Sequence, residues 1–294
     1  MKPLQAAAAA CLFVTAGVAC ADAIELEAAR DNTLFGSRTG HLSNGMGMGI
    51  YVGRTSQPND LDAKRRGLIQ FDVSPIPAGS TVNSVVLHLN LSQTLFGTLT
   101  QIELHRLEAD WGEGVSNAGP QNVCQGGGGT GATAEDGDAT WLHTFYPDSF
   151  WSTPGGDFSE VVSAVTTLEG PGTYWWSSTP ELVADVQAWV DGAAGNFGWL
   201  LLGDESLQFS AKRFDSREAI ADGCPSELPR LVVDFTPPVD CPGDTNADGA
   251  VDVQDLVAVI TAWGSDDAAA DVNGDGTVDV QDLVGVINGW GTCS

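Results

Sequence analysis

The chain has 294 residues and is strongly acidic, with 39 Asp and Glu against 12 Lys and Arg and a formal net charge of −27 at pH 7. A field of this sign repels nucleic acid and anionic membrane surfaces, so neither is an expected partner. Beyond the N-terminal segment no stretch approaches the roughly 20 apolar residues of a spanning helix, so no membrane span is predicted.

Residues 1–21 are predicted to be a signal peptide. A single lysine precedes a small, apolar run over residues 6–18, and Ala19-Cys20-Ala21 places small residues where a signal peptidase cuts. The mature chain is expected to begin near Asp22, and the product to be secreted, extracellular or on the cell surface. Acylation of Cys20 is the weaker alternative, because the residues before it lack the expected leucine.

Residues 22–236 are predicted to form an antiparallel, jelly-roll-like β-sandwich. Turn-forming residues separate stretches in which apolar and polar residues alternate, which is typical of strands in this architecture. The clearest stretches are residues 84–91, 101–107, 198–202 and 230–235. One helix is expected to interrupt them, with Thr179 as its cap, Pro180 in its first turn and Asp191-Gly192 at its end.

Short motifs in this domain resemble those of DNRLRE domains. They are DNT (31–33), RGLIQFD (66–72), IPAG (76–79), WGE (111–113), DVQAWV (185–190), NFGWLL (196–201) and KRFDSRE (212–218). The similarity covers most of residues 24–236, with residues 124–138 as an insertion. DNRLRE domains are β-sandwiches of secreted bacterial and archaeal polysaccharide-active proteins, and some bind carbohydrate. The resemblance therefore implies that polysaccharide is a partner of this domain.

Catalysis by the same domain is weighed against a structural role for its charged residues. Four acidic residues could in principle supply the carboxylate pair of a glycosidase, namely Asp110, Glu113, Asp215 and Glu218. An ion-pair network of Arg213, Arg217 and Glu218 that fixes a strand is the simpler explanation. The four histidines lack metal-ligand spacing, and the sequence contains no nucleophile elbow, phosphate loop or zinc pattern. The chain is therefore predicted not to be an enzyme.

Exposed tryptophan rings could form a stacking platform for sugars. Most tryptophans of a β-sandwich belong to its core, and Trp189 and Trp199 are expected there. Trp175 and Trp176 are adjacent in an extended segment and point to opposite faces, so at most one of the two is expected to be buried.

Residues 237–240 are predicted to be a short, stiff linker to a second domain, residues 241–294. This domain has ten Asp and no basic residue, and it is small enough to need a metal or a disulfide. The four cysteines of the mature chain predict two disulfides among three pairings. The pairs Cys241 with Cys293 and Cys124 with Cys224 are favoured, because each then stays within one domain.

Two acidic loops recur 27 residues apart in the second domain. Alternate oxygens of such a loop can converge on Ca²⁺, and a glycine at its sixth position, Gly249 or Gly276, permits the sharp turn. Two calcium ions are therefore predicted. The predicted ligands are Asp244, Asn246, Asp248, the carbonyl of Ala250, Asp252 and Asp255 in the first loop, and Asp271, Asn273, Asp275, the carbonyl of Thr277, Asp279 and Asp282 in the second. A solvated acidic turn is the weaker alternative, because two copies stand in register before the same apolar helix. Val251 and Val278 are expected to pack between the loops.

The entering helix of an EF-hand is missing before both loops, because prolines precede the first and only residues 265–270 precede the second. A loop with only its exiting helix, duplicated and bracketed by cysteines, resembles a type I dockerin over essentially all of residues 241–294. The resemblance implies a non-catalytic module that binds cohesin domains and attaches secreted proteins to a scaffold or cell surface.

The same resemblance implies that four residues help to choose the cohesin partner, namely Val253, Gln254, Val280 and Gln281. That they only begin and cap the helices remains an equal alternative. The apolar helix positions are expected to be core rather than interface; they are Leu256, Val259, Ile260 and Trp263, with Leu283, Val286, Ile287 and Trp290.

The sequence thus predicts a mainly β, secreted, non-catalytic protein. An antiparallel sandwich of carbohydrate-binding type precedes a small α-helical, calcium-binding dockerin with duplicated EF-hand-like loops, and the whole acts in polysaccharide binding or breakdown. A structural or adhesive surface protein with the sandwich as a spacer is the alternative, and a polysaccharide hydrolase or lyase is less favoured.

Overall fold

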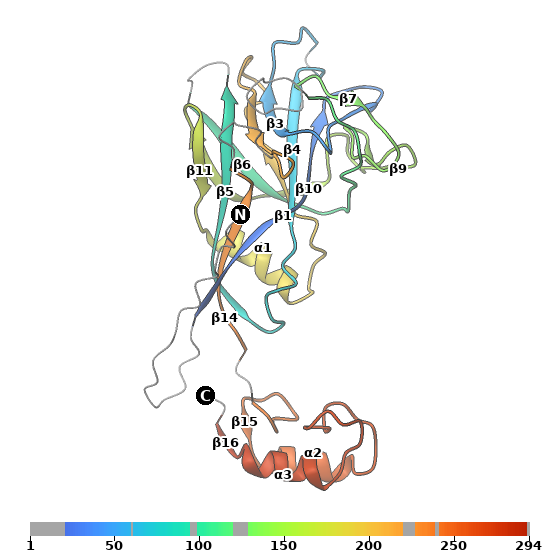
Figure 1. Ribbon diagram of the computed structural model, residues 1–294, viewed down its shortest axis with the longest axis vertical. Coiled ribbons are helices and arrows are strands. Elements are labelled where there is room, and N and C mark those ends of the chain that lie inside the picture. The colour runs from blue at the N-terminus through green and yellow to red at the C-terminus, as the bar shows by residue number, and fades with distance from the viewer. Residues whose placement is uncertain are drawn as a thin grey trace, which may run out of the picture. The chain divides into compact units, whose positions relative to one another are not determined.

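The structure is a computed structural model that describes residues 21–59, 61–94, 99–119, 129–219, 227–238 and 241–292. The chain folds into two compact units, one over Asp22–Phe235 and a second that takes in the chain from Thr236 onward. Each unit is considered by itself (Figure 1). Residues 1–20 of the predicted signal peptide lie outside the described residues, as do linker residues 239–240.

The first unit is built almost entirely of strands. They are β1 (Asp22–Phe35), β2 (Leu42–Ser43), β3 (Gly49–Arg54), β4 (Lys64–Phe71), β5 (Thr81–Thr94), β6 (Thr100–Leu107), β7 (Ala132–Thr133), β8 (His143–Phe145), β9 (Ser149–Phe150), β10 (Phe158–Leu168), β11 (Gly172–Trp176), β12 (Trp199–Leu202), β13 (Lys212–Asp215) and β14 (Arg230–Thr236). Three of the four stretches predicted as strands fall within β5, β6 and β14, and the fourth begins one residue before β12, so these predictions are confirmed.

Among the described residues, ten strands join in one antiparallel sheet that closes on itself. Its order is β1-β14-β5-β13-β3-β4-β12-β6-β10, with β11 on β5 and a further pairing of β1 with β4. The first half of β1 pairs with β14 and its second half with β4, after an irregularity between Ala28 and Arg30. Such a bulge bends a strand and lets it serve two sheet edges. The mainly β fold is confirmed, whereas the jelly-roll-like sandwich is not, because the pairing closes into a barrel.

Alternation along the strands places one set of side chains in the barrel core. Leu87, Leu89 and Leu91 of β5 are fully buried, and the residues between them face outward. Helix α1 (Pro180–Val190) packs against β5 and β10. Thr179 caps it by accepting the Leu182 N–H, as predicted. The rings of Trp189 and Trp199 meet in the core with their centroids 4.6 Å apart, which confirms that both are core residues.

The second unit has two short helices and a two-stranded ladder: β15 (Ala250–Val251), α2 (Val253–Thr261), α3 (Val280–Asn288) and β16 (Gly291–Thr292). No helix occurs in the described stretches 241–252 and 262–279, so neither loop has an entering helix, as predicted. Across the ranges that the structure describes, every helix is too short or too polar to cross a membrane.

Candidate metal centre and partner-binding face

In the first acidic loop, backbone N–H groups donate hydrogen bonds to side-chain oxygens of the same loop. The Asp248 N–H donates to Asp244 Oδ1 at 3.1 Å, and the Gly249 N–H donates to Asp244 Oδ2 at 2.9 Å. The Asp248 N–H also donates to Asn246 Oδ1 at 2.8 Å. The side chains at the first and third positions are therefore drawn in toward the turn, as in an Asx-turn.

The twelfth position of this loop is anchored at the start of α2, where Asp255 is fully buried. Its carboxylate accepts the N–H groups of Thr245, Asn246 and Asp252 at 2.8, 3.2 and 2.8 Å. The Asp252 side chain in turn accepts the Gln254 N–H at 2.7 Å, and it also accepts the backbone N–H of Asp255, which completes a capping box. Burial acts to raise the pKa of Asp255, but these backbone hydrogen bonds together lower it below its ordinary value. Asp255 is thus held as a carboxylate.

The second loop repeats this frame. Asp271 Oδ1 accepts the Gly274 N–H at 2.9 Å, and Oδ2 accepts the Gly276 N–H at 2.7 Å. Asp282 is fully buried and accepts the N–H groups of Asn273 and Asp279 at 3.0 and 2.7 Å. The two loops therefore share one hydrogen-bonding arrangement, as expected for two copies of one motif.

Both loops use left-handed backbone at the same positions. Gly249 and Gly276, at the sixth position, have φ of 87° and 89°. Gly274, at the fourth position of the second loop, has φ of 71°, whereas the first loop has Ala247 there at φ of 58°. Since a Cβ makes this conformation costly, the first loop carries strain that the second lacks.

The oxygens of the two loops fit a calcium ion. Within the described stretches no three His, Cys, Asp or Glu side chains are gathered as they stand into a metal cluster. The donor set is nevertheless made only of carboxylate, amide and carbonyl oxygens, which a hard, flexibly coordinated cation prefers. Ten Asp without a basic residue over 241–294 repel one another, and a divalent cation offsets that repulsion. The individual ligands remain a prediction.

Each helix presents an apolar stripe to solvent rather than to the core. Val253, Val257, Ile260 and Trp263 are 58, 54, 53 and 52% exposed on and after α2. The equivalent residues on and after α3 are Val280, Val284, Ile287 and Trp290, at 56, 47, 54 and 53%. Gln254 and Gln281 are exposed as well. The second unit therefore has two equivalent, solvent-facing apolar stripes.

The prediction of helix core residues was right for one face and wrong for the other. Val259 and Val286 are fully buried, and Leu256 and Leu283 pack against them partly buried. Ile260, Trp263, Ile287 and Trp290, which were also expected in the core, are half exposed. The physical reason is that two helices of nine residues each, packed mainly on one another, can bury only a narrow stripe.

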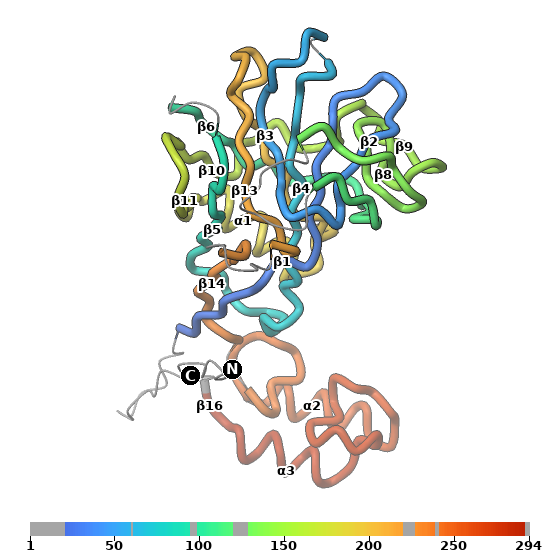
Figure 2. Tube along the Cα trace, turned by 45° about the horizontal axis from the view of Figure 1, so that its top comes forward, coloured from blue at the N-terminus to red at the C-terminus, as the bar shows by residue number. Residues whose placement is uncertain are grey.

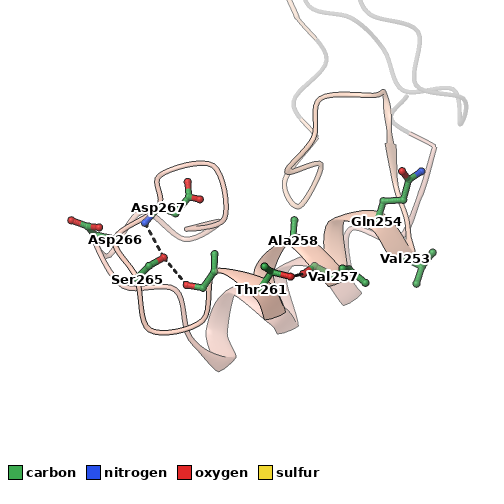
Figure 3. Close-up of a pocket in the computed structure, with 9 residues that line it drawn as sticks. Val253, Gln254, Val257, Ala258, Thr261, Ser265, Asp266 and Asp267 are labelled. Carbon is green, nitrogen blue, oxygen red and sulfur yellow. Dashed lines mark hydrogen bonds between the residues drawn. The ribbon is translucent and has the colours of Figure 1, made fainter.

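A shallow hollow of about 830 Å³ lies beside α2. Figure 3 shows Val253 and Gln254 at the start of the helix and Ser265, Asp266 and Asp267 on the segment that follows it. Its lining includes the apolar side chains of Val257, Ala258 and Ala262 and the acidic side chains of Asp266 and Asp267. Such a surface suits contact with a protein partner.

Val251 and Val278 are buried in the core of this unit. In the described residues, no backbone hydrogen bond joins the two valines to each other. Val251 pairs with Gly291 after α3, and the carbonyl of Val278 accepts the Gly264 N–H after α2 at 2.8 Å. Each loop is therefore hydrogen-bonded to the end of the helix that belongs to the other loop.

The acidic residues considered for catalysis in the barrel are engaged by other side chains. Asp110 pairs with Arg30 at 2.5 Å, and Asn90 donates to Asp215 at 2.6 Å. Arg217 pairs with Glu113 at 2.7 Å and with Glu218 at 3.5 Å. The predicted network thus contains Arg217 and Glu218, and Arg213 donates to the Met48 carbonyl at 3.1 Å.

Asp31 belongs to the same cluster of charged residues as Glu113, Arg217 and Glu218. The sequence alone did not predict this. Asp31 is buried, it accepts the Arg217 N–H at 2.8 Å, and its own N–H donates to Glu113 at 2.9 Å. Burial first, and then the charge of Glu218, raise the pKa of Asp31 well above its ordinary value. Burial together with Glu113 raises the pKa of Glu218 to about 7.

Cys241 takes part in a disulfide. Its predicted partner Cys293, and the predicted pair Cys124 and Cys224, lie outside the described residues, so the pairing stays a prediction.

Residues 242–289 match a known protein family, the dockerin type I domain. The match does not extend to residues 22–236, for which the resemblance to DNRLRE domains stays a prediction. No curated protein matches the chain significantly. Two calcium-type loops, each with only an exiting helix, coincide with the matched range, and residues 242–289 are therefore a dockerin type I domain.

Proposed function

We propose that this protein is secreted and non-catalytic, that its barrel binds polysaccharide, and that its dockerin attaches it to a cohesin-bearing scaffold. Dockerin domains bind cohesins and calcium as a family. For this chain, we propose which residues perform these tasks, that the barrel binds polysaccharide, and that the protein is secreted.

The observation that carries the attachment is the pair of equivalent apolar stripes on α2 and α3. Aliphatic and tryptophan side chains that are half exposed in the free protein gain free energy when a partner removes them from water. Each stripe starts with two exposed residues, which are Val253 and Gln254 on α2 and Val280 and Gln281 on α3. We assign cohesin contact to these four residues together with Ile260 and Ile287.

Calcium is proposed to hold the stripes in place. One ion in each loop would be bound by the ligands predicted above, and each loop leads directly into a helix through Asp255 or Asp282. When calcium is bound it supplies charge neutralisation, which lets the acidic loops fold. The helices then present their stripes in a fixed orientation.

Binding of a cohesin panel tests the assignment of the face. The double variant Ile260→Asp with Ile287→Asp places charges on both stripes without touching a loop. Ala268→Asp with Ala269→Asp adds the same two charges at exposed positions outside the helices and serves as the control. We expect the double variant to lose at least about 100-fold in affinity, or about 3 kcal/mol. Equal binding of the double variant and the control would reject this face.

Polysaccharide binding by the barrel is supported by its resemblance to DNRLRE domains, and the proposal that the barrel is non-catalytic is supported by the contacts that engage its carboxylates. Incubation of the full chain with neutral and acidic polysaccharides tests it, with released oligosaccharide assayed in the same mixtures. Binding without release is expected. Binding to a cohesin alone would instead support a spacer role for the barrel.

A polysaccharide hydrolase is the second candidate, favoured by one observation. Glu218, with its pKa raised to about 7, could donate a proton near neutral pH, and Glu113 contacts the same Arg217. Release of oligosaccharide that disappears in Glu218→Gln would establish this function and overturn the non-catalytic proposal.

A further inference from the structure

A groove of about 400 Å³ lies on the outer face of the barrel, over β5, β11 and β14. Figures 1 and 2 both place β11 beside β5, on the side of the barrel away from β9. The polar and aromatic residues that line the groove are His88, Asn90, Thr173, Trp175, Glu227 and Arg230. None of them belongs to the dockerin.

Strand register decides which tryptophan faces this groove. Trp176 is opposite Leu87 and points inward, where it is fully buried and donates to the Ile102 carbonyl at 2.9 Å. Trp175 is opposite His88 and points outward, with 53% of its surface exposed. The expectation that at most one of the two rings is buried is confirmed.

The Trp175 ring is oriented by its neighbour on β5. The His88 ring meets it edge to face at a centroid distance of 5.9 Å and an interplanar angle of 78°. Partial burial is the main cause that lowers the pKa of His88, with Arg230 acting in the same direction and Glu25 and Glu227 against it, so the imidazole is mainly neutral at pH 7. A neutral imidazole has one nitrogen that donates and one that accepts, which suits it to hydroxyl groups.

Polar groups on the neighbouring strands complete the groove. Thr173 donates to Glu227 Oε2 at 2.6 Å, and Arg230 pairs with Glu25 at 3.0 Å with both side chains about half exposed. Asn90 donates to Asp215, which holds its amide plane in place. The groove therefore offers one exposed aromatic face and several fixed hydrogen-bonding groups within one small concave surface.

We infer that this groove is a binding site for a neutral pyranose unit of a polysaccharide, with Trp175 as the stacking platform. The apolar C–H face of a pyranose ring suits an exposed indole, and its hydroxyls suit the carboxylate, amide, imidazole and guanidinium around it. Among the described residues that line the groove, Arg230 is balanced by Glu227 and by its ion-pair partner Glu25, and the whole chain is strongly negative. This charge disfavours uronate and sulfated sugars. The inference rests on the proposed polysaccharide binding and names the site and the sugar class.

Calorimetric titration of the full chain in calcium tests the inference, with cellohexaose, xylohexaose and mannohexaose as neutral probes and an alginate hexamer as the acidic one. Trp175→Ala removes the platform, and Glu227→Gln removes a charge while keeping the side-chain shape. Phe150→Ala is the matched control, because Phe150 is 62% exposed on β9. We expect at least one neutral hexamer to bind, with about tenfold or greater weakening in Trp175→Ala and no change in Phe150→Ala.

The other outcomes distinguish failure of the proposed site from failure of the proposed polysaccharide binding. Binding of a neutral hexamer that Trp175→Ala leaves intact would overturn the site and keep polysaccharide binding by the barrel. Binding of alginate alone would overturn the sugar class. Binding of no polysaccharide at all would overturn both proposals. If Trp175→Ala loses the native circular dichroism spectrum, Glu227→Gln decides, since it too must weaken binding of the neutral hexamer.

Discussion

The backbone N–H of Gly264 donates to the carbonyl oxygen of Val278 at 2.8 Å, which joins the end of the first dockerin helix to the eighth position of the second loop. The equivalent connection joins Val251 of the first loop to Gly291 after the second helix. Because each loop is hydrogen-bonded to the residues that follow the other loop's helix, binding of calcium in one loop is expected to favour the folded form of both.

This crossed arrangement predicts positive coupling between the two calcium ions. Asp271→Ala removes the first ligand of the second loop and should also weaken calcium binding to the first loop by about 5-fold or more. Calcium titration followed by calorimetry measures both sites. Asp266→Ala, at an exposed position outside the loops, is the control. An unchanged affinity of the first loop in Asp271→Ala would show that the loops act independently.

We predict opposite effects on stability for a matched pair of substitutions at the fourth position of the two loops. Ala247→Gly should stabilise the first loop, because Ala247 holds a left-handed φ of 58°. Gly274→Ala should destabilise the second by about 1 kcal/mol, since its φ is 71° and open space surrounds the added methyl. Thermal unfolding of the dockerin in calcium provides the measurement. Destabilisation by both changes would contradict the strain at Ala247.

The Asp31 and Glu218 pair predicts a pH dependence of barrel stability. Their pKa values are raised in the folded state, so between about pH 4.5 and 7 the folded barrel holds more protons than the unfolded chain. The contribution of Glu218 to stability is therefore greatest below pH 4.5 and is lost as pH rises through 7, and that of Asp31 is lost as pH rises through its own raised pKa. Glu218→Gln cannot ionise, so its unfolding free energy should fall less over this range than that of the wild type. Parallel pH profiles of the two proteins would exclude Glu218 as the source.

Asp185 links helix α1 to the barrel core. It accepts the indole N–H of Trp199 at 2.9 Å and the hydroxyl of Ser163 at 2.5 Å. Asp185→Ala would leave the fully buried Trp199 N–H without this acceptor and should cost about 2–3 kcal/mol of unfolding free energy. Denaturant unfolding measures the loss, with the exposed Glu181→Ala as the control on the same helix. A loss equal to that of the control would contradict the role of this hydrogen bond.

Local patterns in the sequence were enough to predict four of the strands, all three described helices and both loops. Alternation identified the strand that buries Leu87 and Leu89, and capping chemistry identified the start of α1 at Thr179. The loops were predictable because their ligands lie within 12 consecutive residues, so spacing alone encodes the site. The exposed Trp175 followed from the period of an extended strand.

Long-range features could not be predicted in this way. Closure of the sheet depends on the bulge between Ala28 and Arg30, which no local pattern specified. The Asp31 cluster joins positions up to 186 residues apart. The exposure of Trp263 and Trp290 was missed because helical periodicity identifies apolar stripes but not whether a partner or the core covers them.

Calcium-dependent binding to cohesin tests the account most directly. The full chain is titrated with each member of a cohesin panel in calcium and in chelator, beside the double variant Asp244→Ala with Asp271→Ala. The account predicts binding by the wild type in calcium, and none in chelator or by the double variant. Equal binding in chelator, or by the double variant, would contradict the proposal that two calcium loops hold the cohesin-binding face in place.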